Sequence, residues 1–226
     1  IKTSKSGLVN NFSCSKKKVE DFEVQAMSYR EILESNWLHH SGSDNIKIPV
    51  IEALDGQLIT NRLAYKPKVL NGKVVSDVGR DILKIVVVNR YNNAPIAKAF
   101  IKNFGLKQGA LASSVAHDSH NIVAVGVDDE SICRAVNLVI EKKGGVSAVS
   151  KNKEMILALP LAGLMSNEDG YKIAADYTAI DKMTKKELSS TLGSPFMTLS
   201  FMALLVIPHL KLSDLGLFDG DQFKLL

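Results

Sequence analysis

Two histidines and an aspartate, His117, Asp118 and His120, interrupt the otherwise apolar segment from Leu111 to Gly126. A neutral histidine donates a hydrogen bond from one ring nitrogen and accepts one at the other, whereas an ionised aspartate only accepts. Side chains of these types bind metal ions, activate nucleophiles or orient a ligand by hydrogen bonds. Because apolar stretches flank them on both sides, we expect them at the point where one interior strand ends and the next begins.

A metal site and a hydrolytic triad are the two self-contained sites that this segment suggests, and its spacing argues against both. On a strand, His117 and His120 would face opposite sides, and even in a turn or helix the segment supplies at most three ligands. A triad would combine Ser113 or Ser114 with His117 and Asp118, but sequence neighbours rarely reach a relay geometry, and no GxSxG motif is present. Two interpretations stay open. The side chains either hydrogen-bond neighbouring loops, or face a ligand in a site that another domain completes.

Buried strands and one helix are expected to hold this segment in place. Ala110–Ala116 and Asn121–Val127 are predicted as interior strands. Asp81–Val88 is the strongest signal for a central strand, because it is rich in β-branched residues, and it ends in the polar residues Asn89 to Asn93. From Ile132 to Ile140, apolar residues recur at spacings of 3, 1, 3 and 1, which predicts a helix with one buried face that ends at Gly144 and Gly145.

The part before the central strand is predicted to be irregular and then to form hairpins. Residues 1 to 45 show no sustained period, and within them Val24–Asn36 fits a short helix. His39 and His40 beside Trp37 are interpreted as solvated loop and not as a metal site, because adjacent histidines point in different directions. Turns at Asp55-Gly56 and Asn71-Gly72 predict a meander of short strands.

The part after the predicted helix is expected to add a strand pair, a helix and packed loops. Between the central strand and the polar segment, Pro95–Phe104 fits a strand or a short helix equally well. Further predicted elements are a strand pair at Val146–Val149 and Met155–Leu159, a helix opened by a capping box of Ser166 and Asp169, a buried apolar stretch at Phe196–Ile207, and a tail of loops from Lys211 to Leu226. Mixed strands and helices without strict alternation indicate an α+β fold, a layered mixed β-sheet domain with packed helices that a short β-meander segment precedes.

Composition and charge exclude several classes of protein. The formal net charge of +4 is spread along 226 residues, which argues against a nucleic-acid partner. The most apolar stretch is too short to span a bilayer, which takes roughly 20 residues, so we expect no membrane span, and no signal peptide is recognisable. Two cysteines provide no disulfide framework, so a cytoplasmic location is expected. Because the chain opens at Ile1 without an initiator methionine, we expect it to be a piece of something larger.

Three long motifs carry a resemblance to a known family. ASSVAHDSHNIVAVGVDD, LALPLAGLMS and SPFMTLSFMALLVIPHLKLSDLGLFD closely resemble the C-terminal region of bacterial adenine deaminases of the amidohydrolase superfamily, and the likeness runs from about Ile46 to the C-terminus. The resemblance implies a whole enzyme with an N-terminal (β/α)8 barrel. A divalent metal in that barrel, Mn, Fe or Zn with manganese expected, would activate the water that hydrolyses adenine to hypoxanthine and ammonia in purine salvage.

For this chain the resemblance implies a supporting role. Such a barrel needs roughly 250 residues, and none of its metal motifs is present, so we expect the barrel to be missing, and the chain to bind no metal and to be inactive alone. Residues 1–78 would be an irregular segment with β-hairpins, left from an inter-domain β region, and residues 79–226 the C-terminal α/β domain.

The site that the resemblance implies lies at the mouth of a substrate pocket. Ser114, His117, Asp118 and His120 would contact substrate there, with no catalytic residue and no metal ligand assigned in this chain. The expected partners are the chain's own missing barrel, adenine and further copies in a homo-oligomer, and the face that the barrel would cover should expose apolar side chains. The alternative is a noncatalytic ligand-binding or assembly module that shares the fold.

Overall fold

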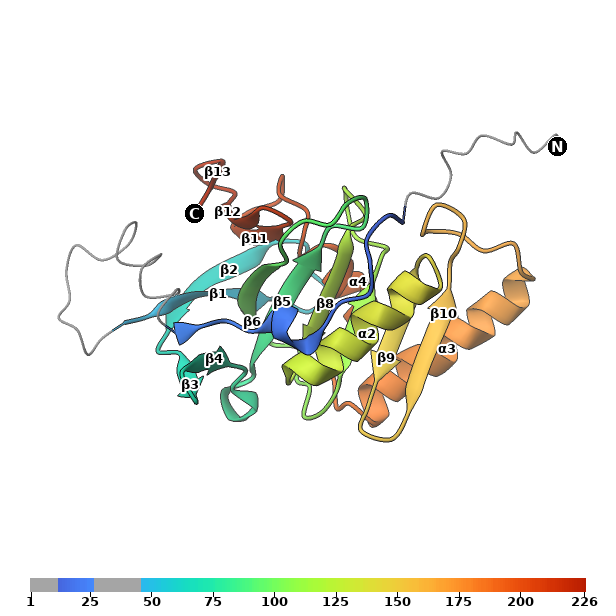
Figure 1. Cartoon of the computed structure of the whole chain (residues 1–226), viewed down its shortest axis with the longest axis horizontal. Coiled ribbons are helices and arrows are strands. Elements are labelled where there is room, and N and C mark those ends of the chain that lie inside the picture. Colours follow the sequence, from blue (N-terminus) through green and yellow to red (C-terminus); the bar gives the residue numbers. More distant parts are fainter. Residues whose placement is uncertain (1–11, 27–45) are drawn as a thin grey trace.

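The β-branched run in the middle of the chain forms strand β5, Ile82–Val88, in which all seven residues are buried. Its neighbour β8, Ile122–Gly126, is also buried throughout. The two strands pair antiparallel in the middle of an eight-stranded sheet (Figure 1). Both were predicted as interior strands, and the computed structural model, which describes residues 12–26 and 46–226, confirms this.

The sheet is mixed, with strand order β10-β9-β7-β8-β5-β6-β1-β2. Neighbouring strands run antiparallel except for β1 and β6, which are parallel. The other strands of the sheet are β1 (Ile48–Ala53), β2 (Thr60–Tyr65), β6 (Ala97–Lys102), β7 (Ala110–Ser113), β9 (Gly145–Val149) and β10 (Glu154–Ala158). The ambiguous stretch Pro95–Phe104 therefore contains a strand, and the turn at Asp55-Gly56 joins β1 to β2 as predicted. The boundary at residue 78 stays a prediction, and strands on both sides of it belong to this one sheet.

Helices cover both faces of the sheet, which confirms the layered α+β fold. On one face lies α2, Asp129–Glu141, in which Ile132, Ala135, Val136, Val139 and Ile140 are buried as their spacing predicted. Its N-cap is Asp128, whose carboxylate accepts from the Ser131 N–H at 2.7 Å.

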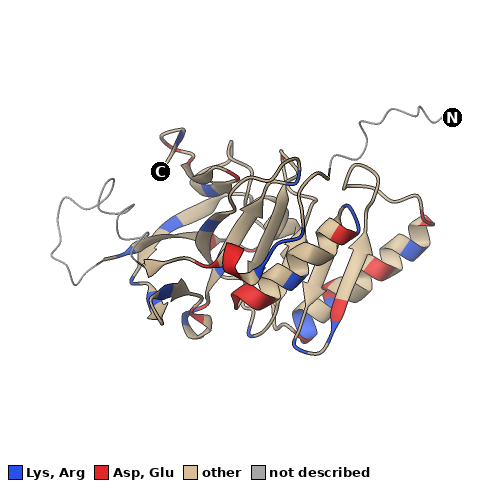
Figure 2. Cartoon of the chain, viewed as in Figure 1, with Lys and Arg blue, Asp and Glu red and all other residues tan. Residues whose placement is uncertain are grey.

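The opposite face carries α3 (Gly170–Lys186) and the short helix α4 (Pro195–Ser200). Figure 2 shows basic and acidic residues interspersed along α2 and α3.

Two small sheets complete the fold. The predicted turn at Asn71-Gly72 joins β3 (Lys68–Leu70) to β4 (Lys73–Val75). The C-terminal strands are β11 (Leu210–Ser213), β12 (Gly216–Asp219) and β13 (Lys224–Leu225), which pair in sequence order. The prediction of a tail made only of loops was therefore wrong. Strands of two to four residues around glycine and aspartate have too short a pattern to recognise without their partners.

Two further predictions about the C-terminal half need correction. Helix α3 begins after Asp169, whose carboxylate accepts from the Lys172 N–H at 3.1 Å, so Ser166 is not its cap. The stretch Phe196–Ile207 is not buried throughout, since Met197 is 54% and Val206 65% exposed. Exposed apolar side chains of this size mark a surface available to a partner.

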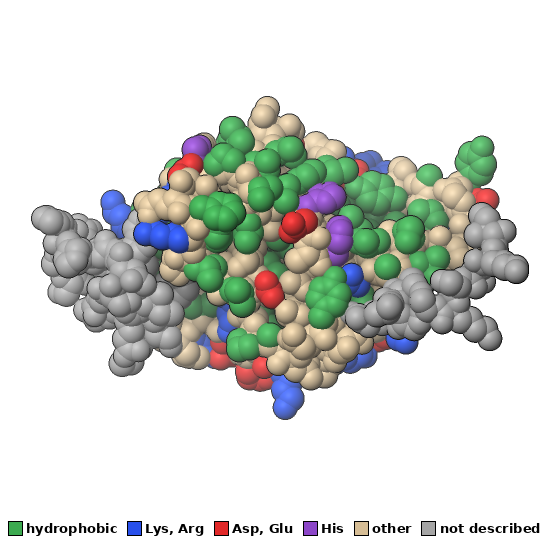
Figure 3. Space-filling model, turned by 90° about the horizontal axis from the view of Figure 1, so that it is seen from above, with side chains coloured by type: hydrophobic (Ala, Val, Ile, Leu, Met, Phe, Trp, Pro, Cys, Tyr) green, Lys and Arg blue, Asp and Glu red, His purple; other side chains and the backbone are tan. Residues whose placement is uncertain are grey.

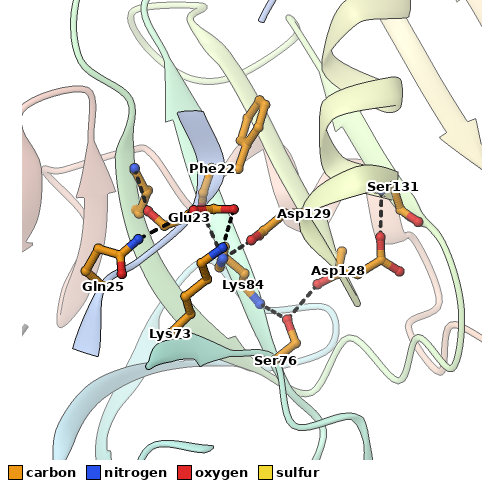
Figure 4. Close-up of polar contacts among 11 residues, drawn as sticks. Phe22, Glu23, Gln25, Lys73, Ser76, Lys84, Asp128, Asp129 and Ser131 are labelled. Atoms are coloured by element: carbon orange, nitrogen blue, oxygen red, sulfur yellow. Dashed lines mark hydrogen bonds and ion pairs between the residues drawn. The ribbon is translucent and has the colours of Figure 1, made fainter. Parts of the chain in front are cut away.

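Residues 12–26, called here the N-terminal strap, run from α2 to the β3–β4 hairpin (Figures 1 and 4). Phe22 on the strap is fully buried against the α2 face of the sheet. The ammonium of Lys84, on β5, donates to the Phe22 carbonyl oxygen at 2.9 Å and forms an ion pair with Asp129 at the start of α2. One buried cation therefore joins the strap, the central strand and the helix.

Most of the predicted helix Val24–Asn36, and the pair His39 and His40, lie outside the described residues. Within the described ranges, no helix is both long and apolar enough to cross a membrane.

Candidate functional site

Residues 117–120, called here the HDSH turn, lie where the sequence pattern expected them, between the antiparallel neighbours β7 and β8. Backbone hydrogen bonds hold both ends of this turn. The His117 N–H donates to the Ser200 carbonyl oxygen, and the His120 N–H donates to the Ala116 carbonyl oxygen, each at 2.8 Å. The first bond attaches the turn to α4, and the second closes it. The two strands and α4 thus present its side chains at the end of the sheet.

The turn brings its two histidine rings to one side. Their centroids lie 5.8 Å apart with the rings inclined at 60°, and Phe201 stacks on His117 at 4.9 Å and 24°. The alternation expected on a strand does not apply here, because the segment is a turn. No third ligand joins them: the described ranges contain no group of three His, Cys, Asp or Glu side chains that could hold a metal ion.

The surroundings of His120 favour the neutral form of its ring. Burial lowers the pKa of the imidazole, and the neighbouring His117 and Arg90 lower it further, against an opposing effect of Asp118. Its Nδ1 is buried and has no hydrogen-bond partner among the described residues. A neutral ring with one unused nitrogen remains able to form a hydrogen bond to a ligand or to another chain segment.

The other predicted site residues differ in accessibility. Asp118 is exposed, so its carboxylate is free to accept from a ligand. Ser114 is fully buried, and its hydroxyl donates to the Gly163 carbonyl oxygen at 2.6 Å and accepts from the Gly145 N–H at 2.8 Å. These bonds connect the end of β7 to the start of β9 and to the segment that follows β10. The role of Ser114 in substrate binding stays a prediction.

Arg90 is a site residue that sequence reasoning missed. Strand β5 ends at Val88, which pairs with Ile122, so Arg90 and His120 both lie just beyond the last paired residues, and Arg90 is close enough to lower the pKa of His120. The Arg90 N–H donates to the Asn121 side-chain oxygen at 3.2 Å, which holds the two segments together beyond the strand ends. The available signal was a polar strand end, but the identity of the neighbouring strand is not visible in a single sequence.

An apolar cavity of about 200 Å³ lies beside the turn, between the sheet and the helices α3 and α4. Its lining comprises Ser113, Val115, Val146, Leu157, Leu159, Tyr177, Phe196, Met197 and Ser200. Burial raises the pKa of the Tyr177 hydroxyl, so that group stays neutral and can donate. Figure 3 shows hydrophobic side chains over much of a face that also carries histidine side chains, with acidic and basic side chains among them and around the rim. A face of this kind favours contact with another polypeptide.

Comparison with known proteins gives one family. The family model described as adenine deaminase C-terminal domain matches residues 57–224. The chain is similar to adenine deaminases of Borreliella burgdorferi (43% identical over 216 residues, 95% of this chain and 36% of that protein) and Methanosarcina barkeri (51% over 185 residues, 82% and 33%). It is also similar to that of Salinibacter ruber (46% over 220 residues, 97% and 37%). The chain thus spans between 33% and 37% of the length of these relatives.

Proposed function

This chain belongs to the adenine deaminase C-terminal domain family, and from that premise we propose that it is part of a metal-dependent enzyme that hydrolyses adenine to hypoxanthine and ammonia. The observation that carries the proposal is the family match over residues 57–224, which includes the whole HDSH turn. The proposed setting is purine salvage in the cytoplasm, with the chain packed on an N-terminal barrel in a homo-oligomer.

The metal belongs to the part of the enzyme outside this chain. The described residues offer no group of three His, Cys, Asp or Glu side chains for an ion, so they do not fit a catalytic metal, which commonly takes three protein ligands. Manganese, iron and zinc all remain compatible with the family. What this chain contributes is the mouth of the substrate site and an apolar surface for packing against the barrel.

The side chains of the HDSH turn suit recognition of a purine. Adenine presents N–H donors and ring-nitrogen acceptors in one plane. The exposed Asp118 accepts from an N–H group, while the neutral His120 ring donates to a ring nitrogen or accepts from an N–H. The stacked pair of His117 and Phe201 adds a flat apolar surface beside them. These contacts orient the base, and the chemistry takes place elsewhere.

Activity should depend on the missing region. The chain alone is expected to release no ammonia from adenine with Mn²⁺, Fe²⁺ or Zn²⁺, because it lacks a full set of metal ligands. The chain fused to the part of the Borreliella burgdorferi relative outside its match, called here the joined protein, should release ammonia. Ammonia release is measured with each metal in turn. Deamination of adenine by the chain alone would contradict the proposal that the metal centre lies outside it. A joined protein that folds but is inactive would favour the alternative, in which this chain is a noncatalytic ligand-binding or assembly module.

Asp118→Asn and His120→Gln, made singly in the joined protein, are expected to lower kcat/KM for adenine roughly tenfold to a hundredfold. Each removes one hydrogen bond to the substrate, worth about 1 to 3 kcal/mol. In the chain alone, the melting temperatures of both variants should stay nearly unchanged, since neither side chain has a hydrogen-bond partner among the described residues.

The matched control is Ser119→Ala, at the exposed position between the two, where kcat/KM should not change. Steady-state kinetics and thermal melts are run on all three variants. If a variant melts far earlier with unaltered activity, its residue is structural and its assignment to the site is wrong.

A further inference from the structure

Arg90 is a buried cation without a matching anion. Arg90 is only 4% exposed, and no carboxylate among the described residues lies within 4.0 Å of its side-chain nitrogens. Nη2 donates to the Tyr91 hydroxyl at 2.9 Å, but Nε and Nη1 are buried with no hydrogen-bond partner. A buried charge normally has a paired charge and satisfied donors, so the free edge of this guanidinium calls for an anion.

The surroundings hold the guanidinium in one place. Its carbon lies 4.8 Å from the centre of the Phe12 ring and 4.7 Å from that of Tyr91, and the Tyr91 hydroxyl donates to the Ser119 carbonyl oxygen at 2.7 Å. On another side, a Cβ built on Gly163 would lie 2.3 Å from Nη1, so a glycine is needed there. Aromatic rings stabilise the charge only partly. The site is thus built around Arg90 and remains one anion short.

His120 supplies a second unused group at the same site. It lies close enough to Arg90 for the guanidinium to lower its pKa, and its buried Nδ1 has no hydrogen-bond partner among the described residues. Burial and the neighbouring His117 and Arg90 lower the pKa of the imidazole, whereas Asp118, which acts on it in the opposite direction, is exposed. The buried charge to be balanced is that of Arg90, and one carboxylate would balance it, whereas a phosphate dianion would leave excess negative charge in a buried place.

We propose that Arg90 and His120 form a receptor for one carboxylate side chain, supplied by the polypeptide region that lies outside this chain in its longer relatives. The inference rests on the proposed function, because it takes that region to cover the HDSH turn. Three observations favour this source over a free anion. The unpaired nitrogens are enclosed, the adjoining face is apolar, and roughly two thirds of each relative lies beyond the match.

The test compares Arg90→Met in the chain alone and in the joined protein, with Arg134→Met, at a partly exposed arginine paired with Glu154, as the matched control. In the chain alone, Arg90→Met should melt no earlier than the parent, because an unpaired buried charge is lost. In the joined protein the same change should lower the melting temperature by several degrees, because a carboxylate loses its partner. Arg134→Met should change the melting temperature of the chain and of the joined protein by the same amount. Equal destabilisation by Arg90→Met in both forms would mean that the guanidinium is a structural group of this chain and would overturn the proposal.

Formate, at constant ionic strength balanced with chloride, is the second probe. It should raise the melting temperature of the chain saturably and leave both the Arg90→Met chain and the joined protein unaffected. The chain variant Phe12→Ala removes one of the two rings that pack on the guanidinium, so it tests whether Phe12 keeps formate from reaching Arg90. If formate stabilises neither the parent chain nor Phe12→Ala, Arg90 and His120 do not form a carboxylate receptor. If formate binds equally to the chain and to the joined protein, the carboxylate does not come from the joined region. Ammonia release, measured separately, reports on the proposed function: an active joined protein indifferent to Arg90→Met refutes this inference alone.

Discussion

Asp129→Ala is expected to lower the free energy of unfolding by about 3 to 5 kcal/mol, because it leaves the Lys84 ammonium charged and buried without its ion-pair partner. The Lys84 side chain is 2% exposed and that of Asp129 18% exposed. Burial lowers the pKa of Lys84, and the bond to Asp129 opposes that shift. Loss of the carboxylate therefore affects the strap, β5 and α2 together.

A double-mutant cycle separates this pair from its surroundings. Lys84→Met should lower the free energy of unfolding by less than Asp129→Ala does. The carboxylate that Lys84→Met leaves unpaired is still reached by water, whereas the ammonium that Asp129→Ala leaves unpaired is not. The double variant Lys84→Met/Asp129→Ala should be more stable than Asp129→Ala alone. Denaturant unfolding of all four proteins measures the coupling energy. The exposed pair of Arg134 and Glu154 is the control, and Glu154→Gln should change stability by about 0.5 kcal/mol or less. Equal costs for Asp129→Ala and Glu154→Gln would show that the buried pair is not coupled.

Lys211→Met is expected to stabilise the protein at pH 7 by about 1 to 3 kcal/mol. Lys211 is fully buried, and burial lowers the pKa of its ammonium from 10.5 to about 8. A shift of this size corresponds to about 3 kcal/mol. Its Nζ donates to the Leu58 carbonyl oxygen at 2.7 Å, and loss of that bond offsets about 1 kcal/mol of the gain.

The pH dependence of stability identifies Lys211 as the cause. Below pH 8 both folded and unfolded chains hold the proton, so the penalty is complete. From pH 8 to about 10.5 the folded chain has lost the proton and the unfolded chain has kept it, so stability rises with pH. The advantage of Lys211→Met should therefore shrink over this window, whereas Lys182→Met, at an exposed position, should have a small effect that does not vary with pH. Urea unfolding at pH 7, 9 and 10.5 measures both variants, and an advantage that stays constant with pH rules out the titration of Lys211.

Local pattern was a reliable guide where one residue type or spacing dominates. The β-branched run became β5, and the spacing from Ile132 to Ile140 became the buried face of α2. The turn residues Asn71 and Gly72, which both have positive φ, join β3 to β4. Each of these signals acts between residues a few positions apart, so it survives without knowledge of the rest of the chain.

Long-range partners account for the elements that were missed. β11 lies beside β2 through the Thr60 hydroxyl, which donates to the Leu210 carbonyl oxygen at 2.8 Å across 150 positions in the chain. Strands this short are stable only when docked, and their sequence of glycine, aspartate and leucine suits a loop equally well. The apolar stretch Phe196–Ile207 likewise divides into buried and exposed residues according to what packs on α4.

For the candidate site, the sequence alone located the polar interruption of the apolar core at His117, Asp118 and His120, between two strands. What surrounds these residues followed from the tertiary structure. The pairing of β5 with β8 brought Arg90 next to the turn, and the bond from His117 to Ser200 brought Phe201 onto it. The physical reason is that hydrophobic periodicity is a property of neighbours along the chain, whereas the pairing of strand ends and the burial of a charge depend on segments that meet only after the whole sheet has formed.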